Sequence, residues 1–182
     1  MLKDFTEKTI ATEMVFKGKI IQVQVDQVKL PNGKVALREL VKHPGAVGIM
    51  AITPERKLVL VRQFRKPLEK TIFELPAGKL EEGEDPISCA QRELEEETGY
   101  QAETLKHVVS FYTSPGFANE ILHLYQAEGL KKGQMKPDQD EFVERVEWSL
   151  DECLARIASG DICDAKTIAA IYLWQVQEMK AQ

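Results

Sequence analysis

The segment from Gly78 to Tyr100 constrains the fold of this 182-residue chain more than any other part of it. Asp85 suits a helix N-cap, Pro86 suits the first helical position, and Gly99 suits the residue just past a helix end. Together these signals predict a helix over residues 86–97. The fold class must therefore place this helix beside the strands that the flanking sequence predicts.

The predicted helix concentrates negative charge. Residues 81–97 hold eight acids and one base, a net charge of −7, whereas the whole chain carries −5. Glu93, Glu96 and Glu97 converge, because residues three and four apart are neighbours on a helix. Each such like-charged pair costs an isolated helix about 0.2–0.5 kcal/mol, and Arg92 offsets only part of that cost. The cluster is either a solvated helix face or a cation site, and magnesium suits the second because it shares its coordination with substrate phosphates.

Strand signals surround this helix. Pro31-Asn32-Gly33 predicts a tight turn, and hence a hairpin between residues 20–28 and 35–41. A second hairpin is expected around the turn at 54–57. The other predicted strands are 71–75, 106–113, 119–127 and 142–148. The sum is an α/β (α+β mixed-sheet) domain over residues 46–182, preceded by an N-terminal antiparallel β region over residues 1–45.

Two further helices are expected near the C-terminus. The first covers residues 150–158, and Asp164 caps the second. In the second helix Ile168, Ile171, Tyr172 and Val176 form an apolar stripe, which we interpret as core or subunit contact.

Composition excludes several classes of protein. No run of about 18 apolar residues is present, so no membrane span is expected. The polar N-terminus lacks a signal-peptide core. Cys89, Cys153 and Cys163 fit neither a disulfide framework nor a zinc site, which predicts reduced thiols and a cytoplasmic location. There is no basic stripe of the kind that binds nucleic acid.

The acidic segment also matches a known pattern. The pattern is the Nudix box, which reads glycine, five residues, glutamate, seven residues, Arg-Glu, an aliphatic residue, any residue, Glu-Glu, any residue, glycine and an aliphatic residue. The matching positions are Gly78, Glu84, Arg92, Glu93, Leu94, Glu96, Glu97 and Gly99. Only Tyr100 departs, in place of the final aliphatic residue, and we expect little consequence. The chain thus resembles the Nudix hydrolase superfamily, whose fold is an α/β/α sandwich.

The resemblance implies roles for individual residues. Glu93, Glu96 and Glu97 correspond to the family's ligands for a divalent cation, Mg²⁺ with Mn²⁺ able to substitute, and the backbone carbonyl of Ala77 is expected to assist. Arg92 corresponds to the arginine that orients the glutamates by salt bridges. Glu84 is expected to support the site, with a structural and a functional role equally open. The implied reaction is hydrolysis of a nucleoside diphosphate derivative by water that the metal activates.

Flanking residues are similar to the ADP-ribose pyrophosphatase subfamily. The similar stretches are 62–65, 74–78 and 112–120. Pro115 corresponds to a proline associated with ADP-ribose hydrolysis, although it could be an ordinary loop turn. Arg65 is expected to grip the diphosphate with its planar fork. Glu74 either binds substrate or merely ends a strand.

The remaining expectations concern the general base and assembly. In this subfamily the base comes from an acidic loop after the box. Here that loop is 135–144, and Glu141 is preferred over Asp140. The subfamily also implies a homodimer in which residues 1–45 reach the partner subunit, with packing within one chain as the alternative. The competing functions are hydrolysis of another nucleotide sugar or a dinucleoside polyphosphate, and a non-catalytic sensor. The sensor is disfavoured because all three metal glutamates are present.

Overall fold

The computed structural model describes residues 3–136 and 141–181. Its internal contacts divide the chain into two compact units. The first unit comprises Met1–Gly45 with Tyr112–Ile121, and the second comprises Ala46–Phe111 with Leu122–Gln182. Each unit is described by itself below.

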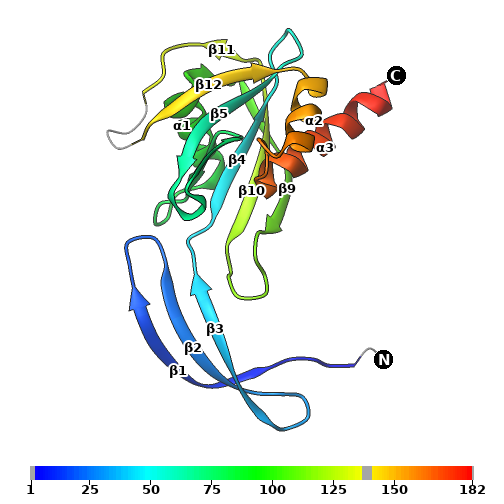
Figure 1. Ribbon diagram of the computed structural model, residues 1–182. Coiled ribbons are helices and arrows are strands. Elements are labelled where there is room, and N and C mark those ends of the chain that lie inside the picture. The colour runs from blue at the N-terminus through cyan, green and yellow to red at the C-terminus, as the bar shows by residue number, and fades with distance from the viewer. Residues whose placement is uncertain (1–2, 137–140, 182) are drawn as a thin grey trace. The chain divides into compact units, whose positions relative to one another are not determined.

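The first unit is an antiparallel sheet in the order β1-β2-β3 (Figure 1). The strands are β1 (Lys8–Lys17), β2 (Gln22–Lys29) and β3 (Val35–Lys42). Gly33 adopts a φ of 83° in the turn between β2 and β3, and Lys29 pairs with Val35. The hairpin predicted from Pro31-Asn32-Gly33 is therefore confirmed, because glycine adopts this left-handed conformation without steric cost.

The segment from Tyr112 to Ile121 is held to β3 by backbone hydrogen bonds. The Val41 amide donates to the Phe117 carbonyl at 2.8 Å, and the Asn119 amide donates to the Val41 carbonyl at 3.2 Å. The Asn119 side chain accepts from the His43 amide at 2.8 Å. These contacts fix the turn that carries Pro115, whose side chain is exposed.

The second unit contains three small sheets. Strands β7-β4-β10-β9 form one, β12-β5-β6 form another, and β11-β8 form a two-stranded ribbon. Their bounds are β4 (Ala46–Ala51), β5 (Leu58–Arg65), β6 (Lys70–Glu74), β7 (Ala77–Lys79), β8 (Tyr100–Gln101), β9 (Thr104–Tyr112), β10 (Ile121–Glu128), β11 (Lys131–Lys132) and β12 (Val143–Trp148), with a short 3-10 turn at Lys66–Leu68. Strands β4 and β10 run parallel, and the other pairs with a recorded register run antiparallel.

Helices cover both faces of these strands (Figure 1). Val47, Ile49 and Ala51 of β4 pack with α1 (Pro86–Thr98) in one core cluster. Ala46 and Met50 pack with α2 (Leu150–Ser159) and α3 (Ala165–Ala181) in the other. Successive side chains of a strand point to opposite faces, so a fully buried strand supplies both cores. The predicted mixed α/β fold with an α/β/α sandwich is confirmed.

One expectation about strand pairing is wrong. Strands β4 and β5 do not form a hairpin, because they belong to different sheets and share only the isolated bridge between Ile52 and Leu58. The apolar stripe on α3 divides into two parts: Ile171 is fully buried and Ile168 packs against the core, whereas Tyr172 is 48% and Val176 46% exposed. Contact of the exposed part with another subunit stays a prediction.

Within the described residues, the structure contains no helix with the length and apolar character that a membrane crossing requires.

Candidate active site

Helix α1 places the candidate metal ligands, and its ends are fixed as predicted. The Asp85 side chain accepts from the Ser88 amide at 3.3 Å, and Gly99 follows the helix with a φ of 71°. Cys89, Ala90 and Leu94 pack into the core beside β4. Glu93 and Glu97 lie along the same buried face, and Glu97 is only 2% exposed. Burial of two carboxylates on one helix is costly unless a cation or hydrogen bonds compensate.

Gly78 makes room for Glu93. A Cβ atom at residue 78 would lie 1.8 Å from Oε1 of Glu93, far inside van der Waals contact. Gly78 pairs with Val47 in the sheet, so its backbone has little freedom to retreat. The box glycine is therefore required because the Glu93 carboxylate lies directly against the β7 backbone.

Glu97 is the most perturbed carboxyl group of the site. Burial raises its pKa to about 8, and the charges of Glu93, Glu141 and Glu74 act in the same direction. The Ala77 amide donates to Oε2 of Glu97 at 2.9 Å and opposes the shift. Burial also raises the pKa of Glu93. These groups therefore resist ionisation unless a cation is supplied.

Glu141 lies within the electrostatic range of both helix glutamates. Its charge contributes to the raised pKa of Glu93 and of Glu97. Glu93, Glu97 and Glu141 are called the carboxylate cluster below. Asp140, the alternative base, lies outside the described residues.

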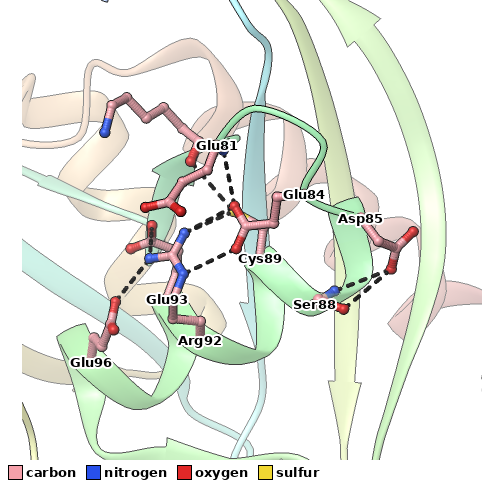
Figure 2. A network of polar contacts seen from close by, with 9 residues as sticks. Glu81, Glu84, Asp85, Ser88, Cys89, Arg92, Glu93 and Glu96 are labelled. Carbon is pink, nitrogen blue, oxygen red and sulfur yellow. Dashed lines mark hydrogen bonds and ion pairs between the residues drawn. The ribbon is translucent and has the colours of Figure 1, made fainter.

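Arg92 organises the solvent-facing side of α1. Its guanidinium donates to Glu84 through Nε and Nη2 at 3.1 and 3.2 Å, and through Nη1 to Glu93 at 2.7 Å and Glu96 at 2.9 Å. Figure 2 shows the guanidinium between Glu84 on one side and Glu93 with Glu96 on the other. Glu84, Arg92 and Glu96 are called the arginine cluster below.

Glu84 is correspondingly stabilised as a carboxylate. The Arg92 hydrogen bonds, with the Glu81 amide at 3.0 Å, lower its pKa to about 2. Glu84 thus joins α1 to the turn that precedes it, because it accepts hydrogen bonds from Arg92 on the helix and from the Glu81 amide in the turn. Of the structural and functional roles left open for Glu84, this contact pattern favours the structural one.

Arg65 and Glu74 bind each other. Nε and Nη2 of Arg65 donate to the two carboxylate oxygens of Glu74 at 2.6 and 2.9 Å. Burial opposes the charge of Arg65, but Glu74, Glu97 and Asp164 outweigh it and raise the arginine pKa. Two nitrogens of the fork, Nε and Nη2, are thus used on Glu74. Whether either residue touches substrate stays a prediction.

Lys166 completes this network and was missed in the sequence. Its ammonium group contacts Glu74 at 2.5 Å and Asp164 at 3.1 Å, with the lysine side chain 11% exposed. Asp164 was predicted only as a helix cap, and it does accept from the Thr167 amide at 3.0 Å. The sequence signal was an acid and a lysine two residues apart at a helix start, which alone predicts nothing beyond capping.

The donor chemistry of the site fits a hard divalent cation. All candidate ligands are oxygens, and burial raises the pKa of Glu93 and Glu97, so a bound cation would stabilise the ionised form of both carboxyl groups. Within the described residues, no three acidic, histidine or cysteine side chains already form a metal ligand set. Arg92 instead engages Oε1 of Glu93 and Oε2 of Glu96, and each carboxylate has a second oxygen to offer.

Comparison with known proteins decides the family. A model of the NUDIX domain matches residues 42–170. The chain belongs to the Nudix family. A second model, the nucleoside diphosphate sugar hydrolase N-terminal domain, matches residues 7–41. The resemblance drawn from the box residues of this Nudix chain is therefore confirmed.

Individual relatives of this Nudix protein cover nearly its whole length. An ADP-ribose pyrophosphatase from Bacillus subtilis is 54% identical over 97% of both chains. A methanol dehydrogenase activator from Bacillus methanolicus is 56% identical over 98% of this chain and 97% of its own. A solved structure described as an ADP compounds hydrolase aligns with a TM-score of 0.86 over 99% of this chain and 98% of its own, at 21% identity, which shows the shared fold.

Proposed function

We propose that this Nudix protein hydrolyses the diphosphate bond of ADP-ribose to AMP and ribose 5-phosphate, with Mg²⁺ as cofactor and Mn²⁺ able to replace it. The single observation that carries the proposal is the burial of Glu93 and Glu97 on one face of α1, which raises the pKa of both carboxyl groups. The substrate assignment is supported by relatives named ADP-ribose pyrophosphatase at 54% and 36% identity.

The proposed mechanism assigns each residue a task. Glu93, Glu96 and Glu97, with the carbonyl of Ala77, would hold the cation. When bound, magnesium neutralises the diphosphate and lowers the pKa of water. Glu141 accepts the proton from the attacking water as general base. Arg92 orients Glu93 and Glu96.

Substrate binding is assigned to Arg65 and Pro115, as the resemblance to the ADP-ribose pyrophosphatase subfamily implies. Nη1 of Arg65 contacts a phosphate oxygen, while Glu74 holds the rest of the guanidinium in a fixed orientation. Pro115, which lies in an exposed turn of the first unit, is kept as a substrate residue on the strength of the resemblance alone. Glu74 acts on substrate through Arg65, because its own carboxylate is 1% exposed and paired.

The test is a substrate panel. Purified protein with Mg²⁺ is offered ADP-ribose, ADP-glucose, GDP-mannose, NADH and diadenosine polyphosphates, and the released phosphomonoesters are measured. The expected result is a preference for ADP-ribose with AMP as product. Preference for another compound would retain the Nudix chemistry and reject the substrate. Binding of ADP-ribose with no turnover would support the sensor.

Activation of a partner dehydrogenase is the second candidate function. It is favoured by the 56% identity to a protein described as a methanol dehydrogenase activator. The test adds this protein, with and without Mg²⁺, to an assay of a purified methanol dehydrogenase. Activation by the wild type but not by Glu97→Gln would place both functions in the same site.

We further propose a homodimer formed through residues 1–45, in a cytoplasmic protein. The first unit exposes large apolar side chains on its strands and turns, namely Ile10, Met14, Val15, Phe16, Ile20, Val35 and Leu37. Large apolar side chains exposed to solvent in this number support an interaction surface in this unit. The cytoplasmic location is supported by the three free cysteines. Light scattering of the purified chain measures the mass, and a monomer would reject the dimer.

A further inference from the structure

Tyr100 is the one position at which this chain departs from the Nudix box, and its side chain makes specific polar contacts. The hydroxyl donates to Oε1 of Glu147 at 2.9 Å. The Arg145 guanidinium lies 5.1 Å from the centre of the Tyr100 ring, which is within cation-π range. An aliphatic residue could fill the same core volume but would offer neither contact. The expectation that this substitution has little consequence is therefore not supported by the geometry.

Arg145 connects the same group to the end of helix α1. Its Nη1 donates to the Thr98 carbonyl at 2.5 Å, and its Nε lies 3.5 Å from Glu147. The last carbonyls of a helix have no partner within the helix, and a cation there also complements the helix dipole. Thr98 is fully buried, so water is a poor substitute for this donor. Tyr100, Arg145 and Glu147 thus join the end of α1 to β12.

Strand β12 leads directly to Glu141. Its register with β5 pairs Val143 with Gln63 and Arg145 with Val61. Alternate residues of a strand share a face, so Val143, Arg145 and Glu147 point to the same side of the sheet. Glu141 precedes the strand by two residues and influences Glu93 and Glu97 electrostatically. The position of β12 relative to α1 therefore determines the position of the Glu141 backbone, and so where its carboxylate can lie.

We propose that Tyr100 and Arg145 are positioning residues for hydrolysis, which hold β12 to the C-terminal end of α1 and so keep Glu141 at the carboxylate cluster. The proposal rests on the proposed function, in which Glu141 is the general base. Neither residue touches the reacting atoms. A displacement of about 1 Å in a catalytic group can reduce a rate up to about 100-fold. A small shift of β12 after loss of the Tyr100 or Arg145 contacts would therefore be enough to lower kcat.

The first test compares Tyr100→Phe with a matched control, Tyr125→Phe. Both tyrosines are 7% exposed and lie in the same core cluster. Tyr100→Phe retains the ring and removes only the hydroxyl that Glu147 accepts. We expect kcat to fall roughly five- to tenfold, with KM and the Mg²⁺ dependence unchanged, because the metal ligands on α1 do not move. Tyr125→Phe should retain wild-type kcat, and a wild-type kcat in Tyr100→Phe would overturn the proposal.

A double-mutant cycle separates positioning of Glu141 from general stabilisation. If Tyr100 acts through Glu141, adding Tyr100→Phe to a Glu141→Gln variant should cause no further loss of kcat. A loss of the same factor in both backgrounds would show that Tyr100 acts by another route. Arg145→Lys keeps the charge near Thr98 and should impair kcat less than Arg145→Met, which serves as the more severe variant.

Hydrogen exchange supplies a readout that does not depend on activity. Amides of residues 141–146 should exchange faster in Tyr100→Phe than in wild type, while those of α1 between 86 and 94 should be unchanged. Unchanged exchange over residues 141–146 would overturn the proposal that Tyr100 and Arg145 hold β12 to the end of α1. If wild-type protein hydrolyses none of the panel compounds, the proposed function fails, and the exchange experiment still decides whether Tyr100 fixes β12.

Discussion

Glu84 of the arginine cluster and Glu97 of the carboxylate cluster are acids of the same box, yet their electrostatic surroundings are opposite. In the first, Arg92 lowers the pKa of Glu84 to about 2. In the second, burial and neighbouring acids raise the pKa of Glu97 to about 8. Glu84 gains its stabilising cation from the chain itself, whereas Glu97 has an amide and like charges around it.

This difference separates structural glutamates from those that await a ligand. A carboxylate satisfied by a guanidinium contributes to the fold, and adding a second cation would gain little. A buried carboxylate that still repels its neighbours lowers the stability of the fold, and a bound divalent cation removes that repulsion. Glu93 lies between the two, because it contacts Arg92 and is also repelled by Glu96 and Glu141. Variants of each cluster should therefore have opposite signatures in activity and stability.

The largest expected effect comes from Glu97→Gln. The amide side chain still accepts from the Ala77 amide but cannot carry the negative charge that attracts the cation. We expect kcat to fall by more than about 100-fold, since even the outer partners of metal ligands contribute about 10–100-fold. Metal-free Glu97→Gln should melt at a higher temperature than metal-free wild type at pH 8.5. Hydrolysis assays and thermal melts in chelator measure the two effects.

Glu95→Gln is the matched control for Glu97→Gln. Glu95 lies on the same helix, is partly exposed, and pairs with Lys136 at 3.4 Å. It should show neither the loss of activity nor the gain in stability. Full activity of Glu97→Gln would show that Glu97 does not belong to the metal site.

Gly78→Ala should have the next largest effect, because it disturbs the boundary between the two clusters. The new methyl group would displace the Glu93 carboxylate, which contacts Arg92 and is also a member of the carboxylate cluster. We expect kcat to fall about tenfold or more, Mg²⁺ affinity to weaken, and stability to drop by about 1–3 kcal/mol through overpacking. Calorimetric Mg²⁺ titration and urea unfolding measure these changes.

Gly48→Ala provides the comparison for Gly78→Ala. Gly48 lies on β4, the strand that pairs with β7, and an added Cβ there would meet its nearest neighbour at an ordinary 3.5 Å. A loss of Mg²⁺ affinity in both variants would indicate a general disturbance of the sheet. A loss confined to Gly78→Ala would support a specific effect on Glu93.

Much of this comparison was predictable from the sequence, and the reason is local. The caps at Asp85, Pro86 and Gly99 determine where α1 lies, and helical spacing then brings Glu93, Glu96 and Glu97 together. The resemblance to the box also predicted that Arg92 forms salt bridges with the glutamates. Long-range pairing was not predictable: nothing local indicates that β4 and β5 enter different sheets, or that Lys166 reaches Glu74 across 92 positions. The Tyr100 contacts were missed for the same reason, because Glu147 lies 47 residues away.

Glu84→Gln should lower kcat less than Glu97→Gln and Gly78→Ala do. The substitution weakens two charge-assisted hydrogen bonds from Arg92 but does not alter Glu97 or its hydrogen bond from the Ala77 amide. We expect a stability loss of about 1–2 kcal/mol and a decrease in kcat of less than about tenfold, through looser orientation of Glu93 and Glu96. Urea unfolding and steady-state kinetics measure both. A loss of activity as large as that of Glu97→Gln would show that Glu84 is itself a metal ligand.

The smallest expected effect is a pair of opposite pH dependences in chelated protein. The raised pKa of Glu97 means that its contribution to stability is complete below about pH 4.5 and is lost as pH rises toward 8. The lowered pKa of Glu84 means that its contribution is present above about pH 4.5 and is lost as pH falls toward 2. The melting temperature of Glu97→Gln should therefore gain on wild type between pH 5 and 8, whereas the deficit of Glu84→Gln should shrink below pH 4.

The surroundings of Glu97 make the alkaline effect a shared one. The charges of Glu93, Glu141 and Glu74 raise the pKa of Glu97, and the charge of Arg65 also interacts with Glu97. Saturating Mg²⁺ should oppose the alkaline loss in wild type, because the cation binds the ionised form, and should have little influence on the acid limb that belongs to Glu84. Melts from pH 3 to 9 at constant ionic strength test this. An alkaline limb identical in wild type and Glu97→Gln would place the raised pKa on another member of the carboxylate cluster.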